Sequence, residues 1–126
     1  MKLRIKGNSL RLRVSPSEVE HLLSAGRIEE IIHFTQEPNG KLTYALEQTP
    51  SKQEISVCYR PQEITVVLST ESARKWAGGE QVGIYGSFEV GSDQLALAVE
   101  KDFACLDGND ASSEDTFANP KSVPIC

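Results

Sequence analysis

The sequence predicts a mainly β protein of the α+β class, a small barrel-like fold made from two similar units with two short helices. Three observations predict it: runs in which charged and apolar residues alternate, two short segments flanked by helix-capping residues, and a second half that repeats the order of the first. The 126 residues, 39% of them hydrophobic, suffice for one domain with a buried core. We expect that domain at residues 1–106, with pseudo-repeats at 1–48 and 54–101, and an acidic, partly flexible tail at 107–126.

The first two strands are predicted to form a hairpin. Charged and apolar residues alternate over 2–6 and again over 10–14, and this period of two is typical of strands. Gly7-Asn8-Ser9 lies between them and favours a tight turn. One face of the hairpin is therefore apolar. The other holds five basic residues and no acid, namely Lys2, Arg4, Lys6, Arg11 and Arg13, although the whole chain has a net charge of −5.

A short helix and two further strands complete the first unit. The helix signals are an N-cap, a proline at the first helical position, a capping-box glutamate and a terminal glycine: Ser15, Pro16, Glu18 and Gly26. The helix carries a narrow apolar stripe of Val19, Leu22 and Leu23. Alternating residues then predict strands at 28–34 and 42–47.

The second half follows the same order. Alternating runs at 55–59 and 64–68 come before a helix that starts at the N-cap Ser69, buries Trp76 and stops at Gly78-Gly79, and strands are expected at 82–90 and 95–100. A shift of 54 positions aligns the two halves, although patterning alone could align any two such segments. Eight strands of this kind can close, or nearly close, into a barrel with helices at its ends. An open sheet with both helices on one face is the alternative.

Two family resemblances follow from the motifs. Residues 7–14, Gly-Asn-Ser-Leu-Arg-Leu-Arg-Val, with the Ser-Pro-capped helix after them, resemble the AbrB/MazE swapped-hairpin family of bacterial DNA-binding regulators and antitoxins over about the first 48 residues. That resemblance implies interleaved ββαββ units and a first hairpin whose basic residues, here Lys2, Arg4, Lys6, Arg11 and Arg13, face DNA. The matching hairpin of the second half departs from the pattern, because Arg60 is its one outward basic residue. Through residues 2–9 and 100–106 the whole chain is also similar to a small bacterial family of unknown function.

We expect a binding module rather than an enzyme, with no cofactor. The sequence contains no glycine-rich phosphate loop, serine elbow or paired-carboxylate motif. His21 and His33 are far apart, and the cysteines form no Cys-x-x-Cys pair, so no metal site is predicted. The basic hairpin face is the candidate site, for DNA or for an acidic protein partner or small ligand. It can equally be a solvated face that keeps an edge hairpin soluble. Neutralisation by the acidic tail of the same chain is a third possibility.

Cysteine content and hydropathy indicate the compartment. Cys58, Cys105 and Cys126 are too few and odd in number for a disulfide scaffold, which agrees with a reducing environment. No apolar run is long enough to span a membrane. We therefore expect a cytoplasmic protein that does not contact membranes, either as a monomer or as a homodimer.

Overall fold

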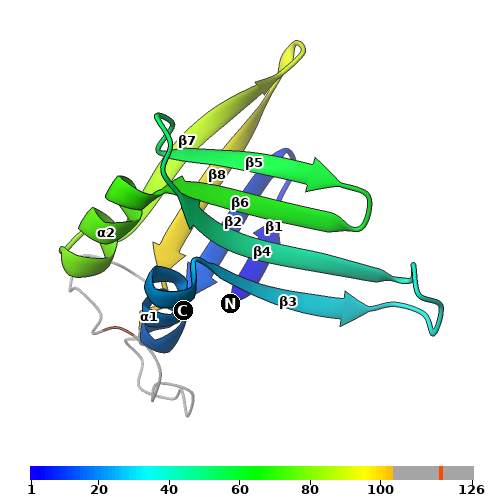
Figure 1. Cartoon of the computed structure of the whole chain (residues 1–126). Coiled ribbons are helices and arrows are strands. Elements are labelled where there is room, and N and C mark those ends of the chain that lie inside the picture. Colours follow the sequence, from blue (N-terminus) through cyan, green and yellow to red (C-terminus); the bar gives the residue numbers. More distant parts are fainter. Residues whose placement is uncertain (104–116, 118–126) are drawn as a thin grey trace.

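The computed structural model describes residues 1–103 and Phe117, and it confirms a mainly β fold (Figure 1). Each strand begins and ends within two residues of its predicted bounds. The predicted tail, Phe117 apart, lies outside the described residues. In chain order the elements are β1 (Lys2–Ile5), β2 (Ser9–Val14), α1 (Pro16–Ala25), β3 (Arg27–His33), β4 (Lys41–Thr49), β5 (Ile55–Arg60), β6 (Glu63–Ser69), α2 (Thr70–Gly78), β7 (Gly83–Val90) and β8 (Asp93–Lys101).

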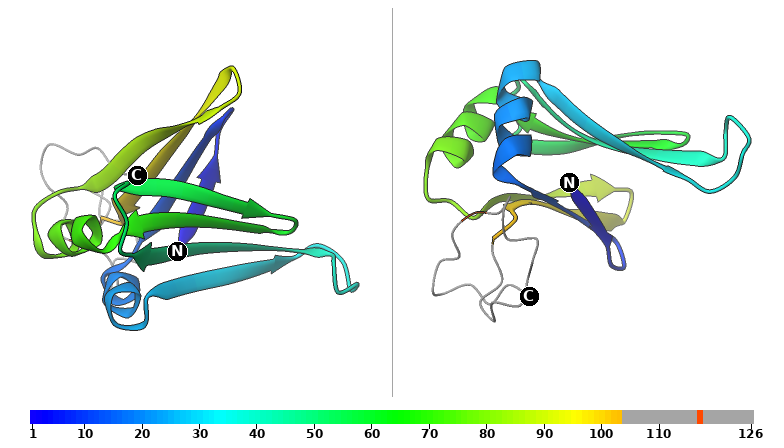
Figure 2. Two further views of the ribbon diagram at one scale, coloured as in Figure 1. Left: turned by 45° about the horizontal axis from the view of Figure 1, so that its top comes forward. Right: turned by 90° about the horizontal axis from the view of Figure 1, so that it is seen from below.

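The strands form two sheets, and each sheet takes one hairpin from each half of the chain. Sheet A has the order β1-β2-β8-β7, and sheet B has the order β3-β4-β6-β5. The hairpins are antiparallel, and the parallel pairs β2–β8 and β4–β6 join them. Helix α1 leads from sheet A to sheet B, and α2 leads back. Both helices therefore lie at one end of the molecule, and the sheets diverge from that end (Figure 2).

The predicted barrel closure is wrong, and so is the single open sheet. The edge strands β1 and β7 of sheet A, and β3 and β5 of sheet B, each pair on one side only within the described residues. Between β5 and β7 a side chain occupies the space where the two edges would have to meet. The Ile55 side chain on β5 lies against Gly86 on β7, where a Cβ atom would come within 2.4 Å of Ile55 Cγ2. Alternating residues mark strands, but they do not say which edges pair.

The core lies between the two sheets at the helix end. Trp76 of α2 and Leu22 of α1 are fully buried, as predicted, and the indole N–H of Trp76 donates to the Val82 carbonyl oxygen at 3.2 Å. The strands contribute the other fully buried large side chains, Leu12, Val14, Leu46, Leu68 and Val99. Leu23 of the predicted apolar stripe is 38% exposed, so the buried stripe of α1 is narrower than predicted. Within the described residues, neither helix has the length and apolar character needed to cross a membrane.

The capping box at the start of α1 is present as predicted. The Glu18 amide donates to Ser15 Oγ at 3.3 Å, and the Ser15 amide donates to Glu18 Oε1 at 2.9 Å. The other carboxylate oxygen of Glu18 accepts from the Met1 amine, which also lies 3.0 Å from Glu30 Oε2. Burial by itself raises the pKa of Glu18, but these hydrogen bonds outweigh it, so the pKa lies below its ordinary value.

Replacing Glu18 by glutamine should lower the free energy of unfolding at pH 7 by about 1 kcal/mol, because glutamine keeps the capping-box hydrogen bond but loses the charge that pairs with the Met1 amine and favours a helix N-terminus. A carboxyl whose folded pKa is lowered contributes stability above its unfolded pKa, ordinarily 4.5, and loses it as the pH falls through the folded value. Urea unfolding at pH 7 and at about pH 3 should therefore show the difference between variant and wild type shrinking in acid. The same difference at both pH values would contradict this role of Glu18.

Candidate functional site

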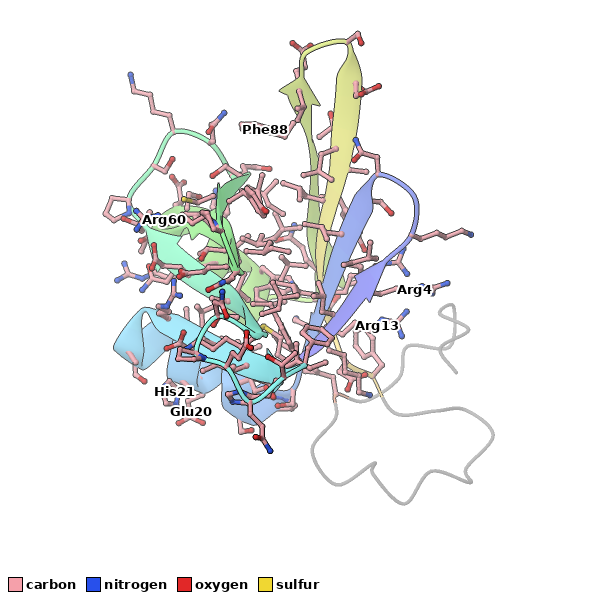
Figure 3. All side chains as sticks on the ribbon, turned by 90° about the vertical axis from the view of Figure 1, so that its right-hand side faces the viewer. Arg4, Arg13, Glu20, His21, Arg60 and Phe88 are labelled. Carbon is pink, nitrogen blue, oxygen red and sulfur yellow. The ribbon has the colours of Figure 1, made fainter. Side chains whose placement is uncertain are left out.

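The basic residues of the first hairpin lie together on the outer surface of sheet A. Lys2 is opposite Arg13 and Arg4 is opposite Arg11 in the β1–β2 register, while the alternate positions face the core. Arg4 and Arg13 point away from sheet B (Figure 3). We call this surface, with Lys6 at the end of β1, the basic face. Like charges directly opposite each other on an antiparallel pair repel, so the register itself favours an anion on this face.

Two carboxylates from β8 and the residue after it neutralise part of the basic face. Strand β8 lies beside β2 in parallel, and Glu100 Oε1 lies 3.3 Å from Arg11 Nε and 3.7 Å from Arg13 Nε. Asp102 Oδ2 lies 2.9 Å from Lys2 Nζ. Within the described part of the chain, five cations thus meet two carboxylates, and the face keeps an excess of positive charge.

Glu100 is held from its other side by a tyrosine. The hydroxyl of Tyr85 on β7 donates to Glu100 Oε2 at 2.7 Å, although 54% of the Tyr85 surface is exposed. Burial of the phenol, followed by the hydrogen bond to Glu100, raises the pKa of Tyr85 to about 12. The Tyr85 hydroxyl is protonated at neutral pH, and its hydrogen bond holds Glu100 beside the two arginines.

The free part of the basic face is at the β1–β2 turn. Arg4 and Lys6 are exposed and make no ion pair with any described residue. With Ser9 and Arg11 they line a shallow hollow of about 130 Å³. The turn below it is fixed, since Lys6 N donates to the Ser9 carbonyl oxygen at 3.2 Å and Asn8 Nδ2 donates to the Gln94 carbonyl oxygen at 2.7 Å. Three cationic side chains around a firm turn can hold a phosphate or carboxylate group.

The outer surface of sheet B contrasts with the basic face. There Arg27, the first residue of β3, lies 3.2 Å from Glu47, 3.0 Å from Glu63 and 3.5 Å from Glu29. Burial by itself lowers the pKa of Arg27, but the hydrogen bonds to Glu63 and Glu47 outweigh that effect, so the pKa lies above its ordinary value. Arg27 is therefore already neutralised within the chain. The unneutralised basic residues of the first hairpin lie on the outer surface of sheet A, and among the residues that the structure describes the outer surface of sheet B has no comparable excess of positive charge around Arg27.

The residues considered for metal binding or catalysis are scattered. No cluster of three or more His, Cys, Asp or Glu side chains that could bind a metal occurs in the described part of the chain. Cys58 on β5 is exposed, and His33 on β3 lies at the opposite edge of sheet B. His21 is exposed on α1. Cys105 and Cys126 lie outside the described residues.

Comparison with known proteins gives a family without an assigned activity. The family model described as a family of unknown function, DUF7009, matches residues 1–121. No curated protein matches the chain, and no solved structure matches it. The resemblance of the first half to the AbrB/MazE family remains a prediction.

Proposed function

We propose that the chain, which belongs to this family of unknown function, DUF7009, is a non-catalytic binding module. Its basic face binds a polyanion, with nucleic acid as the first candidate. The family has no assigned activity to transfer, so the proposal rests on the geometry of the chain itself. The observation that carries this proposal is the pair Arg4 and Lys6, which form no ion pair with any described residue and lie beside Arg11 around one hollow. A cation without an internal partner can bind an external anion without first losing an ion pair.

The charge pattern of the basic face supports a phosphate backbone as the ligand. A DNA duplex carries a negative charge about every 1.7 Å of its axis, so cations on a short hairpin can contact several phosphates. Such contacts would offset the repulsion between Arg4 and Arg11 across the hairpin. Each neutralised phosphate also releases counterions, which favours binding at low salt.

The strand arrangement supports the further proposal of two similar units related to the AbrB/MazE family. The order strand, strand, helix, strand, strand occurs twice, and each sheet joins a hairpin of the first half to one of the second. Two such units interleaved within one chain would produce this exchange. Among the described residues, only the first hairpin has a surface on which basic side chains outnumber their acidic partners, so we propose a single docking face rather than a symmetric pair.

The proposal is tested by fluorescence anisotropy with a labelled random DNA duplex at about 50 and 200 mM salt. If Arg4, Lys6 and Arg11 each contact a phosphate, affinity should fall by roughly 40-fold across that range. Absence of binding at the lower salt would remove nucleic acid as the ligand, and a labelled poly-glutamate peptide in the same assay would then test the alternative of an acidic protein partner.

Replacing Glu100 by glutamine should tighten duplex binding by about 3- to 10-fold, because it releases Arg11 and Arg13 from their internal carboxylate. The matched control is Glu47→Gln, which removes the same charge from the outer surface of sheet B beside Arg27. Anisotropy titrations of both variants separate a local effect from one of net charge. Equal tightening by both variants would show that only net charge matters.

A further inference from the structure

The end of the molecule away from the helices exposes large apolar side chains. All four edge strands run away from the helix end, and each exposes an apolar residue near its far end. Their exposed fractions are 59% for Ile5 of β1, 44% for Ile32 of β3, 73% for Tyr59 of β5 and 53% for Val90 of β7. We call these four residues the apolar mouth. Figure 3 shows the two sheets apart, with the β7–β8 and β1–β2 hairpins of sheet A running upward beside sheet B.

These side chains belong to the faces that the sheets turn toward each other. Ile5 is opposite the buried Leu10, and Tyr59 is opposite Ile64 in a row next to the core residue Val66. Ile28, Glu30 and Ile32 lie on the same face of β3, and Ile28 packs against the core. The mouth is therefore the unfilled continuation of the core rather than a scatter of surface residues. Large apolar side chains left exposed at one end of a soluble protein are candidates for an interaction site.

The charges around the mouth favour a second copy of the same chain over a strongly charged partner. Lys6 makes the β1–β2 turn basic, whereas Glu89 and Asp93 make the β7–β8 turn acidic. The other two turns each carry one residue of either sign, Glu37 with Lys41 and Arg60 with Glu63. A rim with both signs can be complementary to itself when a two-fold axis turns one copy onto another.

We propose that two copies of the chain associate through their apolar mouths into a two-fold dimer. Ile5, Ile32, Tyr59 and Val90 of each copy lie in the interface, and the basic turn of one copy lies near the acidic turn of the other. In this dimer Arg4, Arg11 and Arg13 stay on the outward surface of sheet A, whereas Lys6 at the β1–β2 turn lies near the acidic turn of the other copy. The dimer forms without nucleic acid, so the inference does not depend on nucleic-acid binding. Burial of apolar surface drives the association, which therefore persists when salt is raised.

Neighbouring residues on β3 provide a matched test. Ile32 faces the mouth and is 44% exposed, whereas Ile31 faces the outer surface and is 46% exposed. Sedimentation velocity of the whole chain at roughly 1 and 100 µM measures the dimer population. We expect a dimer for the wild type and for Ile31→Glu. Ile32→Glu should raise the dimer dissociation constant about tenfold or more.

A second variant, on the other sheet, distinguishes loss of the dimer interface from local unfolding of β3. Val90→Glu, on the inner face of β7, should weaken the dimer as Ile32→Glu does, and circular dichroism of both variants verifies that they are folded. A wild type that stays monomeric at the higher concentration overturns the proposal. A dimer that both glutamate variants leave intact also overturns it. Equal loss from Ile31→Glu and Ile32→Glu points to pairing of β3 edges and overturns it as well.

Discussion

The double variant Arg4→Glu with Lys6→Glu should bind a DNA duplex at least about 100-fold more weakly than the wild type at low salt, because two charge-assisted phosphate contacts are lost and two repulsive groups replace them. Both side chains are exposed and form no ion pair within the described residues. The free energy of unfolding should therefore change by less than about 0.5 kcal/mol. Anisotropy titration and urea unfolding of the same preparation measure the two effects.

The control for this reversal is Arg74→Glu with Lys75→Glu. These two exposed cations lie on α2, and their replacement changes the net charge of the chain by the same amount. The control should retain most of the duplex affinity. Equal loss in both double variants would mean that binding depends on net charge alone, and that the basic face is a solvated edge.

The largest loss of stability is expected from Trp76→Ala. The Trp76 side chain is completely buried between the helices and the sheets, and its indole N–H donates to the Val82 carbonyl oxygen. Truncation of a buried tryptophan costs about 3–5 kcal/mol. That is a large part of the stability of a typical domain. Chemical unfolding followed by circular dichroism measures the loss, since the variant has no tryptophan left to fluoresce.

Trp76→Phe is the companion variant. Phenylalanine keeps an aromatic ring in the core and loses only the hydrogen bond and part of the volume. Its cost should be clearly smaller than that of alanine. A loss below about 1 kcal/mol for Trp76→Ala would contradict a core centred on the helix end.

The local structure of this chain follows from short-range signals, whereas its sheet pairing does not. Ser15, Glu18 and Gly26 define α1 because capping depends on residues within a few positions. Alternation of charged and apolar residues predicts the strands for the same reason, because it relates residues only two positions apart. The parallel β2–β8 pair joins residues more than 80 positions apart, such as Arg13 and Glu100, and no local pattern encodes that contact. The barrel prediction was wrong because it assumed a pairing of edges that the sequence does not specify.

The candidate site also combines residues that local patterns predict with a residue that only the folded chain brings there. Alternation alone placed Lys2, Arg4, Arg11 and Arg13 on one surface, and the structure brings them together. Glu100, which neutralises part of that surface, lay beyond sequence reasoning because β8 joins β2 only in the folded chain. The apolar mouth was missed for a different reason. Residues such as Ile32 alternate as core residues do, and only the divergence of the sheets leaves them exposed.

The central claim, that the basic face binds phosphates through Arg4, Lys6 and Arg11, is tested most directly by the slope of log affinity against log salt for duplex binding. Three phosphate contacts predict a slope of about −2.7 for the wild type. The Arg4→Glu and Lys6→Glu double variant should have a slope smaller in magnitude by about two. A wild-type affinity that does not change with salt, or a variant with the wild-type slope, would contradict the claim.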